Sequence, residues 1–384
     1  KSTSVLRSWL GVRVSSGALH IYAFREVLRC YYQVVKTLLN PVKTLSLLLV
    51  VSSAALLAGC TPAPVEDKRA VVIVSGGDAV SPFTTTTEAC KTGLSAGNTD
   101  TGLREKLIAD GYEVFTAPAM NARTKVVEPA ADSFGAFGDC PDPLPEYMTI
   151  VSNADVDNAG EHLAHFANYL NETYGVTQID WVGHSNGGLY ARSATRILQQ
   201  MSSPVQGVSL TTVGTPWMGS FPFQVVYGEE PATDCMGDPR CEGIIAGITE
   251  ELSNDQLLAR EQLYKYILGD KGWNQAQIGV LDDIPVFMLG GAYLANDAGD
   301  PRFWPFDGLV SAYSATAQGL PETTAPQRQC KVYPLTHSIF ISNLLELDWQ
   351  TALTWNTEAL DDVSAFIAAA REGKMPTGDG CVTP

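Results

Sequence analysis

The segment Gly183-His184-Ser185-Asn186-Gly187-Gly188 decides how the rest of the chain is interpreted. Residues 177–182 before it form a short apolar segment typical of a buried strand, and residues 189–201 after it carry apolar residues at helical spacing. A G-x-S-x-G sequence between a strand and a helix is typical of a nucleophile elbow, a tight turn that holds a serine hydroxyl above the edge of a sheet. We therefore expect Ser185 to be a nucleophile.

Two backbone N–H groups are predicted to bind negative charge beside this serine, as an oxyanion hole. The first belongs to Asn186, which follows the serine at the N-terminus of the predicted helix. Residues 70–74 are an apolar run that fits a central parallel strand, and Ser75-Gly76-Gly77-Asp78 follows them. In hydrolases with a nucleophile elbow the loop after an early strand supplies the second donor, and Gly77 is our candidate. A plain strand-ending turn is the alternative interpretation.

Apolar runs and helical patterns alternate along the chain. The runs predict strands at 70–74, 112–117, 177–182, 208–213, 285–289 and 331–333, and the helical patterns cover 101–109, 189–201, 351–371 and a segment from Asp155 or Asp157 to Tyr174. Strands that alternate with helices predict an α/β fold, a mostly parallel sheet with helices on both faces. Residues 118–149 are rich in Gly, Pro and acidic residues, so we expect a loop there.

The strand predicted at 208–213 leads into Gly214-Thr215-Pro216-Trp217-Met218-Gly219-Ser220. Together with the elbow segment before it, this sequence resembles the lipase branch of the α/β-hydrolase superfamily, over residues 70–340. The resemblance implies an α/β-hydrolase fold. It also implies that Trp217 and Met218 face the acyl or alcohol pocket, and core packing is the alternative for both. His184 is expected to border the pocket or to shape the turn.

The histidine that would activate the serine is found by elimination. The chain has five histidines, and in the α/β-hydrolase order the base follows the nucleophile, which leaves His337 alone. The resemblance implies that the triad acid lies in a D-G-x-V context after the strand at 285–289, and Asp307 matches that context. Asp297 and Asp300 are the alternatives. The predicted triad therefore consists of the elbow serine, Asp307 and His337.

Such a triad predicts a carboxylic ester hydrolase of the lipase or esterase type that works through an acyl-enzyme and needs no cofactor. Three alternatives stay open: a polyester depolymerase, an amidase or peptidase with the same triad, and a non-catalytic surface lipoprotein whose pocket binds acyl ligands. A calcium ion near the acidic loop at 296–304 is a further alternative, although no residues specify its ligands.

Residues 224–283 interrupt the alternation of strands and helices, and they include a helical stretch at 254–268. In similar lipases an inserted helical cap governs access to the site, and the resemblance implies a small cap here. A peripheral helix that packs on the sheet is the alternative.

The α/β-hydrolase domain is predicted to span residues 70–384. Residues 45–57, behind Lys43, are an apolar run that is too short to cross a bilayer. Such a run is typical of the hydrophobic region of a signal peptide. We therefore expect residues 1–59 to comprise an upstream extension and a signal peptide.

The apolar run ends in Leu57-Ala58-Gly59-Cys60, which resembles a bacterial lipobox. The resemblance implies cleavage before Cys60 and acylation of that cysteine, with residues 60–69 as a flexible tether. The protein is then expected to be exported and lipid-anchored to the outer membrane or cell surface. An ordinary secreted protein is the alternative.

Six cysteines follow the lipobox, and an even number behind an export signal predicts three disulfides. We expect neighbours to pair: Cys90 with Cys140, Cys235 with Cys241, and Cys330 with Cys381. No metal site is predicted, because the chain has no C-x-x-C and few histidines near its cysteines. His162 and His165 lie three apart on one predicted helix, but no third ligand is near, so a solvated face is expected.

The charge distribution argues against nucleic acid as a partner. Residues 1–60 carry seven of the 25 basic residues and one of the 42 acidic residues, which leaves 18 basic and 41 acidic residues, a net charge of −23, for the remainder. Such a surface repels phosphate backbones. The expected partners are an ester or lipid substrate and, through the lipid anchor, a membrane.

Overall fold

The computed structural model describes residues 67–89, 97–121, 142–253, 267 and 272–374, which belong to one unit, Asp67–Pro384. Several predictions fall outside the described residues. These are the signal peptide, the lipidated Cys60, the helix at 254–268, and the cysteines Cys90, Cys140 and Cys381.

A parallel sheet of six strands, in the order β2-β1-β5-β6-β7-β8, is the centre of the described part of the chain. The strands are β1 (Lys68–Val74), β2 (Val114–Thr116), β5 (Val176–His184), β6 (Gln206–Val213), β7 (Val286–Gly291) and β8 (Arg328–Tyr333). Each one was predicted from its apolar run. Strand β2 is shorter than predicted, because Tyr112 still closes the preceding turn by donating its backbone N–H to Leu107 O, at 3.1 Å.

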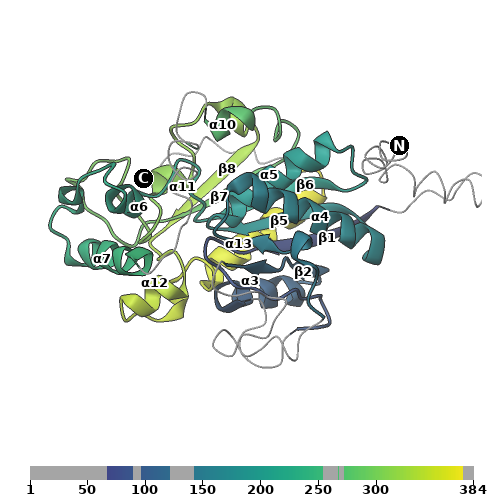
Figure 1. Ribbon diagram of the computed structural model, residues 1–384, viewed down its shortest axis with the longest axis horizontal. Helices are drawn as coiled ribbons and strands as arrows, with labels where there is room; N and C mark the ends of the chain where they lie inside the picture. Colours follow the sequence, from purple (N-terminus) through teal and green to yellow (C-terminus); the bar gives the residue numbers. More distant parts are fainter. Residues whose placement is uncertain (1–66, 90–96, 122–141, 254–266, 268–271, 375–384) are drawn as a thin grey trace, which may run out of the picture. The chain divides into compact units, whose positions relative to one another are not determined.

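Two layers of helices cover the sheet (Figure 1). Alternate residues of β1 pack into each layer. Val72 and Val74 pack in the cluster that contains α4 (Val156–Tyr174) and α5 (Gly187–Gln200). The neighbouring residues Val71 and Ile73 pack with two further helices on the opposite face. These are α3 (Gly97–Ala109) and α13 (Thr357–Arg371). The α/β fold expected from the alternation of strands and helices is confirmed.

Capping residues fix the beginnings of two helices, one that the sequence left open and one that it placed too early. Asp155 caps α4, because its side chain accepts a hydrogen bond from Asn158 N at 2.7 Å. Helix α13 begins at Thr357 rather than at residue 351. The physical reason is that the Asn356 side chain caps it by accepting from Ala359 N, while η5 (Trp349–Thr351) forms a separate 3-10 turn.

Shorter elements complete the described chain. They are β3 (Ala119–Met120), which lies inside the segment expected to be a loop, its partner β4 (Ile150–Val151), η2 (Glu146–Met148), α6 (Phe221–Val226), η3 (Ala232–Cys235), α7 (Pro239–Ser253), α10 (Trp273–Ala276), α11 (Ala312–Ala315), η4 (Glu322–Thr324) and α12 (Ile339–Leu344). Helix α7 was not predicted. It packs beside α6 within the segment 224–283 (Figure 1), whose role as a cap stays a prediction.

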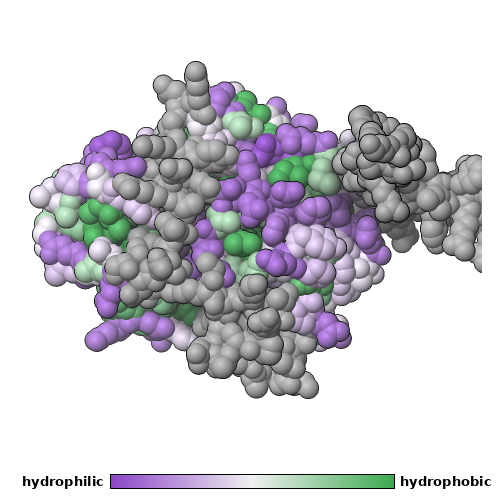
Figure 2. Space-filling view, viewed as in Figure 1, coloured by the Kyte–Doolittle hydropathy of each residue, from purple (hydrophilic) through white to green (hydrophobic). Residues whose placement is uncertain are grey.

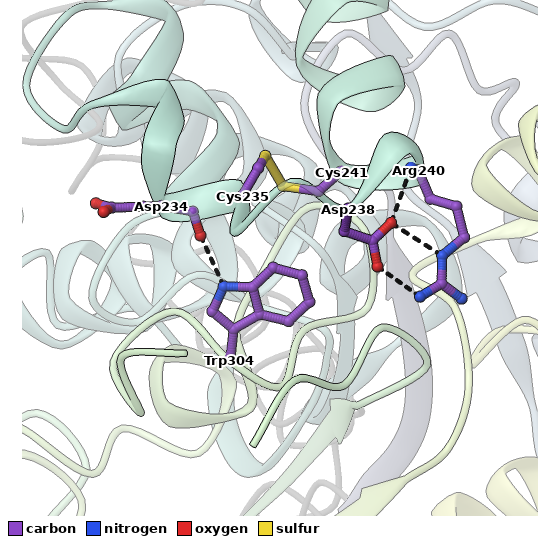
Figure 3. Close-up of a disulfide and its surroundings, with 6 residues drawn as sticks. All are labelled: Asp234, Cys235, Asp238, Arg240, Cys241 and Trp304. Atoms are coloured by element: carbon purple, nitrogen blue, oxygen red, sulfur yellow. Dashed lines mark hydrogen bonds and ion pairs between the residues drawn. A yellow bond between two sulfur atoms is a disulfide. The ribbon is translucent and has the colours of Figure 1, made fainter. Parts of the chain in front are cut away.

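A disulfide between Cys235 and Cys241 joins η3 to the start of α7, as the sequence predicted (Figure 3). The indole of Trp304 donates a hydrogen bond to Asp234 O at 2.9 Å, next to this bridge. Both cysteines are fully buried in a cluster with Trp304 and its neighbours from the 303–306 segment. The bridge closes a short loop within the 221–253 segment, and the apolar cluster and the Trp304 hydrogen bond attach this segment to the loop that precedes Asp307. Cys330 is also disulfide-bonded, and its predicted partner lies outside the described residues.

The visible surface of the described residues is mostly hydrophilic, with separate hydrophobic patches (Figure 2). Within the described ranges, no helix has the length and apolar character that a membrane span requires.

Candidate active site

The turn between β5 and α5 holds Ser185 in a conformation that few side chains adopt. Its φ angle is +53°, in the left-handed region. The turn is held from the neighbouring strand, because Ser185 N donates to Val213 O at 2.8 Å. Ser185 is partly exposed within this otherwise buried turn, and such strained backbone is characteristic of functional sites.

Glycines make this turn sterically feasible. A Cβ atom on Gly183 would lie 2.4 Å from Gly188 N, and one on Gly187 would lie 2.0 Å from Val74 O. Both distances are shorter than any real contact, so the small residues on either side of Ser185 are a packing requirement.

The loop after β1 lies directly against the serine. A Cβ atom on Gly76 would be 2.6 Å from Ser185 Cβ and 3.2 Å from Ser185 Oγ. Gly77, the predicted second oxyanion donor, is the next residue in this loop. The loop expected to supply the donor therefore borders Ser185.

Ser152 fixes this loop, and sequence reasoning missed it. Its carbonyl oxygen accepts from Asp78 N at 3.3 Å and from Tyr190 Oη at 2.7 Å, while its hydroxyl donates to Ala79 O at 2.8 Å. Ser152 follows β4 and Tyr190 lies on α5, so long-range contacts create this anchor. No local pattern in the sequence could have identified it.

We expect Gly76→Ala to reduce ester hydrolysis by about a hundredfold, because the added methyl group must displace Ser185 or the loop by a fraction of an ångström to an ångström. Steady-state kinetics on a nitrophenyl ester measures the change. Gly243→Ala, where an added Cβ meets nothing within 4 Å, is the matched control and should keep the wild-type rate. Equal rates for the two variants would show that the close approach at Gly76 is not needed.

Asp307 and His337 form a buried pair. His337 Nδ1 lies 2.8 Å from Asp307 Oδ2, and the side chains are 2% and 0% exposed. Asp307 Oδ1 accepts from the backbone N–H groups of Leu309, at 2.9 Å, and Val310, at 2.7 Å. The carboxylate is therefore oriented on both sides, and it fixes the Nδ1–H tautomer of the imidazole.

The pair of Asp307 and His337 lies beside the end of β6, and the same strand end is hydrogen-bonded to Ser185. A Cβ atom on Gly214, just after β6, would be 2.9 Å from His337 Nδ1 and 3.2 Å from Asp307 Oδ2. Val213, the residue before it, accepts the hydrogen bond from Ser185 N. His337 Nε2, the nitrogen that would face the serine, is buried and has no hydrogen-bond partner among the described residues. Ser185 Oγ is therefore not hydrogen-bonded to it here, as is common before substrate binds.

The order of the three residues along the chain and their positions on the sheet fit the same fold. The serine follows β5, the acid follows β7 and the histidine follows β8, all at the carboxyl ends of parallel strands. The chain has the α/β-hydrolase fold.

Among solved structures, the chain is similar to the mature form of the lipase BlEst2 from Bacillus licheniformis, with 16% identity over 75% of this chain and 91% of that chain and a TM-score of 0.41. It is similar to the Staphylococcus hyicus lipase, with 14% identity over 82% of this chain and 99% of that chain and a TM-score of 0.45. It is also similar to a Thermogutta terrifontis esterase, with 13% identity over 79% and 91% of the two chains and a TM-score of 0.38. No family model matches the chain, and no curated protein matches it.

The two alternative acids have other surroundings than Asp307. Asp300 is engaged with Arg302, whose guanidinium lowers the pKa of its carboxyl group. Asp297 is exposed in the loop before it. Of the three candidate acids, Asp307 is the one that contacts His337.

Trp217 does not face a pocket, contrary to the implication of the resemblance. It is fully buried, and the guanidinium of Arg192 stacks on its ring at 3.9 Å from the centroid. Its indole N–H donates to Thr212 Oγ1 at 3.1 Å. Arg192 lies on α5, so the tryptophan serves to join β6 to that helix. Core packing, the alternative interpretation, describes it.

Met218, in contrast, lines a cavity of about 170 Å³ together with Phe221, Phe303 and Tyr313. None of the triad residues lines this cavity. Its place in substrate binding therefore stays a prediction.

His184 is buried beside His337. It is 6% exposed, and its Nε2 lies 3.2 Å from the backbone oxygen of His337. The two rings are 4.9 Å apart between centroids. Both roles expected for His184, at the pocket and in the turn, stay predictions, and its contact with His337 was not predicted.

The histidines of α4 have structural contacts. His162 Nδ1 lies 2.7 Å from Thr149 O, and His165 packs edge-on against Tyr147. They are therefore not on a fully solvated face, because η2 covers them. Among the described residues, no group of three potential ligands is arranged to hold a metal ion.

Proposed function

We propose that the protein is a carboxylic ester hydrolase that acts through Ser185, His337 and Asp307. The observation that carries the proposal is the 2.8 Å contact between His337 Nδ1 and Asp307 Oδ2, beside the strand end that holds the strained serine turn. A buried carboxylate that orients an imidazole next to an elbow serine is the arrangement that activates a hydroxyl for acyl transfer.

In the proposed mechanism, Ser185 Oγ attacks the carbonyl carbon of the ester while His337 Nε2 takes the hydroxyl proton. The C–O bond to the alcohol then breaks, and the imidazolium gives its proton to the departing oxygen. Water attacks the acyl-enzyme, again with loss of a proton to Nε2, and the serine recovers that proton as the acid leaves. Asp307 stabilises the imidazolium in both steps.

The negative oxygen of each tetrahedral intermediate is proposed to bind the backbone N–H groups of Asn186 and Gly77. Asn186 stands at the N-terminus of α5, where helix N–H groups point toward negative charge. Gly77 follows the glycine that packs against Ser185. Loss of one such donor raises the barrier by about 3 kcal/mol.

The reaction class is tested with nitrophenyl esters from acetate to palmitate and with the matching nitroanilides. We expect hydrolysis of the esters and background rates with the anilides. The dependence on acyl length then separates an esterase from a lipase, and anilide rates equal to the ester rates would instead indicate an amidase.

We also propose that the protein is exported and anchored through a lipid on Cys60. Support comes from the apolar run at 45–57 and the Leu-Ala-Gly-Cys sequence that ends it. In a bacterial host fed a clickable fatty acid, Cys60→Ser should lose the label and leave the membrane fraction, while Cys30→Ser should keep both. Equal labelling of the two variants would refute the anchor.

A further inference from the structure

A buried chain of polar side chains lies behind the catalytic histidine, and the proposed mechanism does not use it. The hydroxyls of Ser81 and Ser75 are 2.6 Å apart. Ser75 Oγ in turn donates to Asp100 Oδ2 at 2.5 Å. All three side chains are almost completely buried, and Asp100 is 1% exposed. A carboxyl group so deeply buried requires partners on both of its oxygens.

His184 continues this chain to residue 337. Its Nε2 lies 3.2 Å from His337 O, and its Nδ1 lies 3.6 Å from Asp100 Oδ1. A carbonyl oxygen can only accept a hydrogen bond, so the contact with His337 O places a proton on Nε2. In a neutral imidazole, Nδ1 is then an acceptor that faces Asp100.

An ionised Asp100 would conflict with this arrangement. Asp100 Oδ1 has no hydrogen-bond partner among the described residues, and its contact at 3.6 Å would join two acceptors. A proton on Oδ1 removes the conflict and points a donor toward Nδ1, across a distance slightly longer than a hydrogen bond. Burial acts in the same direction: it raises the pKa of Asp100 to about 7, against the opposing effects of the Ser75 hydrogen bond and the charge of His337. Burial also lowers the pKa of His184 well below its usual value.

We propose that protonated Asp100 is a positioning residue that holds the catalytic histidine in place through His184. The inference rests on the proposed function, since it assigns a role to the support of His337. The backbone of residue 337 is held on two sides: its N–H donates to Asp307 O at 2.8 Å, and its carbonyl oxygen accepts from His184. Loss of the proton from Asp100 would favour the other tautomer of His184 and release the second contact.

Other charged groups near α3 are engaged elsewhere. On α3, Arg104 donates to Thr84 and Thr85, and Lys106 pairs with Asp110 and Asp361. Other basic residues also have acidic partners: Lys68 pairs with Glu113, Arg69 and Arg371 with Asp180, and Lys331 with Glu358 and Asp362. Glu105 is exposed on the same helix. Within the described ranges, His184 and His337 are therefore the titratable groups that act on Asp100.

Two substitutions test whether the protonated or the charged form of Asp100 supports His337. Asp100→Asn keeps an oxygen to accept from Ser75 and adds an N–H that can donate to His184 Nδ1, so it mimics the protonated acid at every pH. Asp100→Leu has a similar volume and leaves both partners without a hydrogen bond. At pH 6 we expect the Asn variant to remain within about threefold of the wild-type kcat and the Leu variant to fall at least about tenfold, with KM unchanged in both.

The pH profile is the readout that a merely structural role would not move. As pH rises through about 7, the wild type loses the Asp100 proton and the Asn variant has none to lose. The ratio of kcat for Asp100→Asn to wild-type kcat should therefore increase above pH 7. The same proton affects stability. Between about pH 4 and 7 the folded wild type holds the Asp100 proton, whereas the unfolded chain has released it. The free energy of unfolding of the wild type should therefore fall, relative to that of the Asn variant, as pH rises across that window.

Failure of the inference can be told from failure of the proposed function by the rate at which a fluorophosphonate labels Ser185. An unlabelled wild type would refute the proposed function and the inference together. A labelled wild type with equally fast labelling of Asp100→Leu would overturn the inference alone. If Asp100→Leu does not fold, the Asn variant decides: loss of kcat that grows above pH 7 would mean that the charged carboxylate, not its proton, supports the histidine.

Discussion

Ser185→Ala is expected to lower kcat for ester hydrolysis by at least about 10⁴-fold, because no other group in the proposed mechanism can form the acyl-enzyme. The fold should survive, since alanine keeps the Cβ atom that packs against Gly76 and removes only the hydroxyl. Steady-state kinetics with a short-chain nitrophenyl ester measures the loss, and thermal unfolding checks that the variant is folded.

The matched control is Ser202→Ala. Ser202 also has a positive φ angle, +50°, in the turn just after α5, but it is exposed and far along the helix from the elbow. This variant should keep the wild-type rate, which separates the effect of the nucleophile from that of strained serines in general. A Ser185→Ala protein with near wild-type activity would exclude the proposed mechanism.

Asp307→Asn is expected to reduce kcat by about 10⁴-fold at neutral pH, with little change in KM. The backbone N–H groups of Leu309 and Val310 require an oxygen at the Oδ1 position, so the new NH₂ group must face His337 Nδ1. That contact forces Nδ1 to accept and moves the imidazole proton to Nε2. The nitrogen that should take the serine proton is then already protonated.

Asp300→Asn is the control for this substitution, because it alters one of the two other acids that the sequence offered, in a loop of the same region. We expect it to weaken the contact with Arg302 and to leave kcat within about twofold of the wild type, as for other exposed ion pairs. The assignment of the acid would be reversed if Asp300→Asn lost activity and Asp307→Asn kept it.

Local sequence patterns were sufficient for the elements that carry the site. The apolar run before Ser185 and the helical spacing after it predicted β5 and α5, because both signals depend on nearest neighbours along the chain. His337 followed from chain order and from the small number of histidines. The resemblance to lipases implied Asp307 through its D-G-x-V context, and the structure places this residue against His337.

What the sequence could not reveal depends on contacts between distant segments. Trp217 is a large aromatic residue of the kind that often lines a pocket, but Arg192 on α5 stacks on its ring and buries it. Asp100 gave no signal within its helix, because its partners Ser75 and His184 lie on other elements. The beginning of α13 was misplaced because a side-chain cap, not apolar spacing, determines it.

The central claim is that Ser185 is an activated nucleophile at the edge of this sheet, and covalent labelling tests it most directly. A fluorophosphonate probe reacts with serines that a neighbouring base activates. After incubation with the wild type, intact-mass measurement should show a single adduct, and peptide mapping should place it on Ser185, with no adduct on Ser185→Ala. An unmodified wild type, or an adduct that persists on Ser185→Ala, would contradict the account.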